Sequence, residues 1–134
     1  MILGVDPGER RVGLAVADLE TRFARPLEVV DTRTTDPMAR IKELVAELGV
    51  TGIVVGRPVT LAGGEGPAMD AHKTFVVGLR SAVEIDVDVY DERMTTVIAE
   101  RALKDSGASA GRRKEIRDAV AAQVMLQGFL DSRA

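Results

Sequence analysis

Short apolar runs recur along the chain and predict the strands of a sheet. Residues 2–6 and 11–17 flank the turn sequence Pro7-Gly8-Glu9-Arg10 and predict a β-hairpin, and a third strand is predicted over residues 24–30. A continuous apolar run within residues 51–56 is typical of a buried parallel strand. Residues 85–90 alternate apolar and acidic positions, which indicates a half-exposed strand. The pattern therefore predicts five strands.

Segments with helical spacing lie between and after these strands. Asp36 and Pro37 predict the capped start of a helix that Gly49 ends, and Pro67 predicts the start of a second helix. Two further helices are predicted over residues 95–106 and 112–130. This order predicts an α/β fold. Its five-stranded mixed sheet begins with an antiparallel meander of three strands and is flanked by helices.

Composition narrows the class of protein. The chain has 134 residues, and we expect residues 1–134 to form a single domain. It has no cysteine, which excludes disulfides, cysteine metal ligands and a thiol nucleophile. No apolar stretch approaches the roughly 20 residues of a membrane span, and no basic region opens the chain, so we expect a cytoplasmic protein with no membrane partner. The net charge of −3 neither favours nor excludes nucleic acid.

Three acids stand where the predicted fold would bring them together. Asp6 ends the first strand, and Glu92 follows the end of the fifth. The carboxyl ends of parallel strands share one edge of a sheet, where sites form. Asp118 shares a helical stripe with apolar residues that must pack inward, namely Ala122, Met125 and Phe129. We therefore expect Asp6, Glu92 and Asp118 to converge.

Converging carboxylates, with no basic residue on the Asp118 stripe, would repel one another unless a cation lay between them. Mg²⁺ and Mn²⁺ prefer such oxygen ligands, and one or two ions can activate water for phosphodiester cleavage. Glu115, three residues before Asp118, is a candidate fourth ligand. Each of the three acids also has a structural alternative. Asp6 can initiate a turn, Glu92 can pair with a surface cation, and Asp118 suits a helix N-terminus.

Basic residues flank the same positions. They occur in the first hairpin turn, near strand ends and early in the last helix: Arg10, Arg11, Arg57, Arg93, Arg113, Lys114 and Arg117. Contacts with nucleic-acid phosphates are the functional interpretation, and solvated surface charge is the alternative. His72 is the single histidine, and for it a packing or surface role is favoured over a role as general base.

Four ordered segments resemble one family. They read LGVDPG and GLAVA (residues 3–8 and 13–17), IVVGRP (53–58), DERMTT (91–96) and DAVAAQVML (118–126). These segments resemble the YqgF-type family of Holliday junction resolvases, also described as pre-16S rRNA nucleases and related to RuvC-type resolvases. Arg57 and Arg117 depart from the family pattern, which often has apolar residues there. Glu115 resembles one of the paired acids of the RuvC-type enzymes.

The resemblance implies a ribonuclease-H-like fold and a nuclease that depends on a divalent metal. Asp6, Glu92 and Asp118 then correspond to the family's catalytic acids. The implied substrate is RNA, in 5′-end maturation of pre-16S rRNA, with Holliday junction DNA as another possibility, and the protein is expected to be a monomer or homodimer.

Two other functions stay open from the residues. One is a non-catalytic nucleic-acid-binding or ribosome-assembly factor on the same fold. The other is a phosphate-binding ATPase of the sugar-kinase type, which the absence of a second copy of the domain disfavours.

Overall fold

The computed structural model describes residues 1–57, 67–91 and 110–133. Within these ranges lie the strands β1 (Ile2–Pro7), β2 (Arg11–Ala17), β3 (Ala24–Asp31), β4 (Gly52–Arg57) and β5 (Asp86–Asp91). The helices are α1 (Pro37–Leu48), α2 (Pro67–Ala82) and α4 (Ala110–Ser132). The five predicted strands are confirmed with small shifts of their ends. The helix predicted over residues 95–106 lies outside the described residues.

The five strands form one mixed sheet in the order β3-β2-β1-β4-β5. The pairs β1–β2 and β2–β3 are antiparallel, as the predicted meander requires. The pairs β1–β4 and β4–β5 are parallel. The carboxyl ends of β1, β4 and β5 therefore lie along the same edge of the sheet, which confirms the topology on which the predicted site depends.

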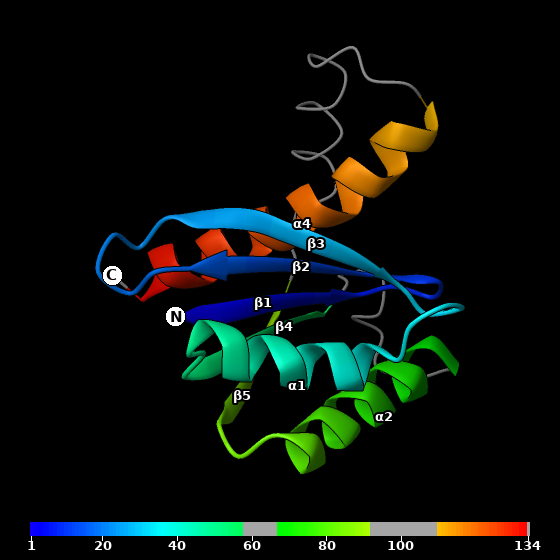
Figure 1. Cartoon of the computed structure of the whole chain (residues 1–134), viewed down its shortest axis with the longest axis horizontal. Coiled ribbons are helices and arrows are strands. Elements are labelled where there is room, and N and C mark those ends of the chain that lie inside the picture. Colours follow the sequence, from blue (N-terminus) through cyan, green and yellow to red (C-terminus); the bar gives the residue numbers. More distant parts are fainter. Residues whose placement is uncertain (58–66, 92–109, 134) are drawn as a thin grey trace.

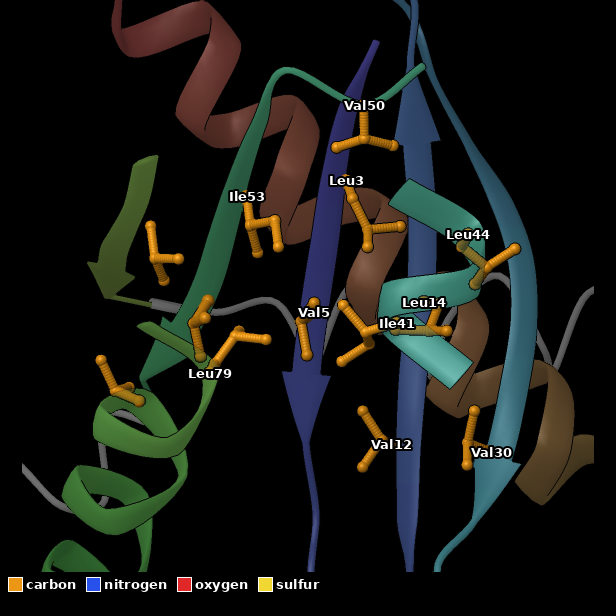
Figure 2. Close-up of a cluster of buried hydrophobic side chains, with 13 residues drawn as sticks. Leu3, Val5, Val12, Leu14, Val30, Ile41, Leu44, Val50, Ile53 and Leu79 are labelled. Atoms are coloured by element: carbon orange, nitrogen blue, oxygen red, sulfur yellow. The ribbon is translucent and has the colours of Figure 1, made fainter. Parts of the chain in front are cut away.

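Helices cover both faces of the sheet (Figure 1), with α1 and α2 on one face and α4 on the other. The α1/α2 face is lined by branched aliphatic residues (Figure 2). Its fully buried members include Leu3, Val5, Leu14, Ile41, Ile53 and Leu79. Burial of such side chains removes a large apolar area from water and supplies the main stabilisation of the fold.

The core under α4 is built from smaller strand residues. Ala15 and Ala17 of β2 and Val54 of β4 pack there against Met125 and Leu126, which are fully buried. Short side chains on the strands leave room for the helix to lie close to the sheet.

Local signals set the ends of α1 as the sequence predicts. The Asp36 side chain accepts a hydrogen bond of 3.0 Å from the backbone amide of Met38, and Pro37 occupies the first turn. Gly49 ends the helix in the left-handed conformation with a φ of 64°. None of the helices within the described residues has the length and apolar character needed to span a bilayer.

Amide side chains tie the C-terminal half of α4 to the start of β3. The Gln127 carboxamide accepts from the Ala24 amide at 2.8 Å and donates to the Arg22 carbonyl at 3.0 Å. Gln123 donates to the Ala24 carbonyl at 3.1 Å, and the Arg22 guanidinium donates to the Leu130 carbonyl at 2.6 Å. Hydrogen bonds thus accompany the apolar contacts at this end of the helix.

Truncating Leu14 tests the main core. Leu14 is fully buried, whereas Leu19 is 48% exposed just beyond the same strand. We expect Leu14→Ala to lower the free energy of unfolding by about 2–5 kcal/mol, through lost burial and a residual cavity. Leu19→Ala should change it by no more than about 0.5 kcal/mol. Urea unfolding of both variants measures the difference, and equal effects would contradict this description of the core.

Candidate metal centre

Asp6 lies at the carboxyl end of β1 on the face that α4 covers. Gly4 identifies that face, because a Cβ built on Gly4 would lie 2.9 Å from the Cβ of Leu126 in α4. Strand residues two apart point to the same side, so Asp6 shares the face of Gly4. Asp6 is partly buried and pairs with Gly13 of β2 in the sheet register.

Asp118 reaches the same place from α4. A Cβ built on Gly13 would overlap the backbone carbonyl of Asp118, so the helix crosses β2 directly over Gly13. Since Gly13 is the register partner of Asp6, the two acids come to one region of one face. The predicted inward stripe is confirmed for its apolar members, because Ala122 and Met125 are fully buried. The Asp118 side chain itself is 31% exposed.

Arg11 supplies a cation beside Asp118. Its Nη1 lies 4.0 Å from Asp118 Oδ2, and its side chain is 25% exposed. The helical pattern does not indicate this partner, which comes from the neighbouring strand. The pair compensates part of the Asp118 charge.

Arg57 and Asp91 form an ion pair at the last rung of the β4–β5 pairing. Arg57 Nε donates to Asp91 Oδ1 at 2.7 Å, and both side chains are about 40% exposed. The bond raises the pKa of Arg57 above its ordinary value. Val55 and Val87 on the same strands pack with α1 and α2, so strand alternation places this pair on the face opposite Asp6.

Asp31 is an acid of this region that the sequence did not single out. It pairs with Arg11 in the β2–β3 register. Its carboxylate accepts from Arg33 Nε at 3.2 Å, Arg33 Nη2 at 3.0 Å and the Arg33 amide at 2.9 Å. These bonds, led by the guanidinium, lower the pKa of Asp31 from 3.8 to about 2. The signal in the sequence was the spacing Asp31-Thr32-Arg33, which suits a turn closed by the acid.

His72 of α2 makes a structural contact with the end of β4. It is 8% exposed, and its Nε2 lies 3.0 Å from the Gly56 carbonyl. The carbonyl can only accept, so the ring nitrogen donates. This contact agrees with the packing role that the sequence favours.

The remaining predicted site residues fall into two groups. Arg10 is exposed in the β1–β2 turn, and its carbonyl accepts from the Thr32 amide at 2.9 Å. Four others lie on α4 before Asp118, where the backbone is described: Arg113, Lys114, Glu115 and Arg117. Glu92 and Arg93 lie outside the described residues. In the part of the chain that the structure describes, no three His, Cys, Asp or Glu side chains gather as a metal site.

The chain matches the family model described as "RuvX: Holliday junction resolvase" over residues 1–132. A relative from Chloroflexus aggregans, named "Putative pre-16S rRNA nuclease", is 43% identical over 133 residues, which cover 98% of this chain and 94% of the relative. A relative of the same name from Bacillus thuringiensis is 41% identical over 135 residues and covers 98% of both chains.

Solved structures of resolvases share the fold. The RuvC of T. thermophilus in complex with a Holliday junction substrate has a TM-score of 0.58 at 23% identity, covering 98% of this chain and 94% of that one. The resolvase of Fowlpox virus in complex with Holliday junction DNA has a TM-score of 0.56 at 11% identity, covering 98% and 97%. The predicted ribonuclease-H-like architecture is thereby confirmed.

Removing the Arg33 side-chain donor tests the origin of the low Asp31 pKa. We expect Arg33→Gln to raise the Asp31 pKa from about 2 toward 3.8, stopping short because a backbone amide and Arg11 still act on the carboxylate. Because the folded-state pKa is depressed, the pair stabilises the protein above about pH 4, and this stabilisation is lost as the pH falls toward about 2. Carboxyl NMR titration measures the pKa. Arg25→Gln, on the same strand, should leave it unchanged, and an unchanged value in Arg33→Gln would refute the assignment.

A double-mutant cycle tests how firmly Asp91 holds Arg57. Arg57→Leu, Asp91→Asn and the double variant should give a coupling free energy below about 1 kcal/mol, because both side chains are well exposed. Chemical unfolding at low and high salt measures it, and salt should weaken it further. Such weak coupling leaves Arg57 able to exchange Asp91 for a phosphate. A coupling of several kcal/mol would instead make the pair a fixed structural element.

Proposed function

Because the chain belongs to the RuvX family of Holliday junction resolvases, we propose that it is a metal-dependent nuclease that hydrolyses phosphodiester bonds in structured nucleic acid. The proposal assigns the chemistry to Asp6, Glu92 and Asp118 within one domain spanning residues 1–134. The observation that carries it is the crossing of α4 over Gly13, the register partner of Asp6. This crossing brings two acids from opposite ends of the sequence to one edge of the sheet.

The donor chemistry of Asp6 and Asp118 fits a hard divalent cation. Carboxylate oxygens are the ligands that Mg²⁺ and Mn²⁺ prefer, and a cation between two partly buried acids relieves their repulsion. When bound, one or two such ions would supply an activated water and stabilise the leaving oxygen. Glu92 completes the proposed ligand set, and Glu115 is a candidate fourth ligand.

The chain's own cations suit the phosphate backbone of the substrate. Arg10 is exposed beside the edge that carries Asp6, and Arg11 lies next to Asp118. Phosphate contacts of this kind position a nucleic acid without reading its sequence. The proposal adds the other basic residues of the region to this surface: Arg57, Arg93, Arg113, Lys114 and Arg117.

We take RNA as the substrate, because the relatives about 40% identical to the chain are named for pre-16S rRNA. The proposed role is 5′-end maturation of that RNA in the cytoplasm. Branched DNA is the other substrate class, since the family is described by Holliday junction resolution. A single cut in RNA needs one site, which a monomer supplies, whereas symmetric cleavage of a junction needs two sites, which a homodimer supplies.

A non-catalytic nucleic-acid-binding factor on the same fold is the second candidate. The contact between Arg11 and Asp118 favours it, because a guanidinium beside the carboxylate compensates charge without any metal. In that case the acids serve the fold, and the basic residues alone carry the function.

A cleavage assay separates the two candidates. Ribosomal precursor RNA and a four-way DNA junction are each incubated with Mg²⁺ or Mn²⁺ and the wild-type protein. We expect Asp6→Asn and Asp118→Asn to reduce cleavage by at least about 100-fold, because each removes a charged metal ligand.

Asp86→Asn is the matched control for this assay. Asp86 is an exposed acid at the amino end of β5, paired with Gly52 at the opposite edge of the sheet from Asp6, and its loss should leave the rate unchanged. Full metal-dependent cleavage by Asp6→Asn would remove the proposed site. Metal-independent binding without cleavage of either substrate would establish the binding factor.

A further inference from the structure

We propose that Gly13 is a positioning residue of the site: its missing side chain sets how closely α4 lies on β2 and so holds Asp118 beside Asp6. The inference rests on the proposed function, since it concerns the placement of two of the acids assigned there. It assigns a specific task to a residue that carries no functional group of its own.

Three backbone atoms leave no space at Gly13. A Cβ built there would overlap the Asp118 carbonyl oxygen, would lie 2.8 Å from the carbon of that carbonyl and would lie 3.5 Å from the Ala119 nitrogen. Real Cβ atoms essentially never come within 3.0 Å of another heavy atom. Because these neighbours belong to the helix backbone, no change of rotamer can relieve the overlap, and the helix or the strand must move.

Two other sheet glycines meet different atoms. A Cβ on Gly4 would lie 2.9 Å from the Cβ of Leu126, so it would also press on α4, but at a side-chain atom away from Asp118. A Cβ on Gly52 would meet the tip of the Ile2 side chain at 3.1 Å, which a small rotation can relieve. Gly13 thus meets helix backbone at the level of Asp118, whereas Gly4 meets a side chain two turns further along.

The cost of a glycine within a strand supports a specific purpose. Glycine weakens a strand because it loses more backbone entropy on folding and packs no side chain. Gly13 lies within β2, paired on one side with Asp6 and on the other with Val29. A close approach of another backbone is one of the reasons for glycine within a strand, and here the approaching backbone carries Asp118.

Displacement of α4 at this point would act directly on metal binding. A methyl group at residue 13 would force the helix from the strand by roughly 1 Å, a misplacement large enough to disturb a preorganised site. Asp118 would move with its helix, while Asp6 would stay with the sheet. The same movement would also alter the distance between Asp118 and Arg11, which lies on β2 two residues before Gly13.

Three alanine variants separate positioning from packing. We expect Gly13→Ala to weaken Mn²⁺ binding by about tenfold or more in calorimetric titration. In the metal-free protein, its amide NMR shifts should change most around Asp118 and Asp6. Gly4→Ala should lower the urea midpoint through its contact with Leu126 but keep Mn²⁺ affinity within about twofold of wild type. Gly52→Ala should resemble wild type in both measurements.

The outcomes distinguish this inference from the function on which it rests. If Mn²⁺ binds wild type and Asp6→Asn equally, the proposed metal site fails, whereas the metal-free NMR shifts still report whether Gly13 places Asp118. If Gly13→Ala keeps wild-type affinity and shifts, Gly13 does not position the site. Equal loss of affinity in Gly4→Ala would make the effect one of general packing and overturn the proposal. Gly13→Ala is also measured with an osmolyte that favours the folded state. If the variant is still unfolded there, Gly13 is needed for folding and the positioning proposal is overturned as well.

Discussion

The central place of β1 is the constraint on which the rest of the structure depends. The strand is paired on both sides, antiparallel with β2 and parallel with β4, and each of its faces is covered by helices. Leu3 and Val5 point into the aliphatic core, and Gly4 and Asp6 take the opposite face. A charged residue on such a strand can be accommodated at its end, where the sheet edge gives access to water and cations.

The acids at this edge of the sheet meet cations on both faces. Asp91 pairs with Arg57 on the α1/α2 face, and Asp31, at the end of β3, pairs with Arg33 in the turn that follows. On the face that α4 covers, Asp118 lies 4.0 Å from Arg11. The strand or helix that carries each acid thus decides which cation it meets and on which face of the sheet.

The fold was predictable where the signal is local. Period-two and continuous apolar runs define the strands, and Asp36, Pro37 and Gly49 define α1, because each acts on its own backbone neighbours. The stripe of Asp118 followed from helical geometry alone. Partners brought in by register were out of reach: Arg11 meets Asp118, and Arg57 meets Asp91, across elements whose alignment no local pattern states. The tight contact at Gly13 belongs to the same class, since it depends on the depth at which a distant helix lies.

The side-chain hydrogen bonds between α4 and the start of β3 also affect how the helix is rotated about its axis. A helix that slid by one residue along its axis would turn each side chain by roughly 100°, since a turn holds 3.6 residues. The buried stripe of α4 opposes such a turn, because Ala122, Met125 and Leu126 would leave the sheet. Gln123 and Gln127 bond to particular backbone groups around Ala24, and those bonds exist in one register alone. These hydrogen bonds help to fix the rotation of α4 about its axis. The direction in which Asp118 points therefore depends on contacts at the far end of its own helix.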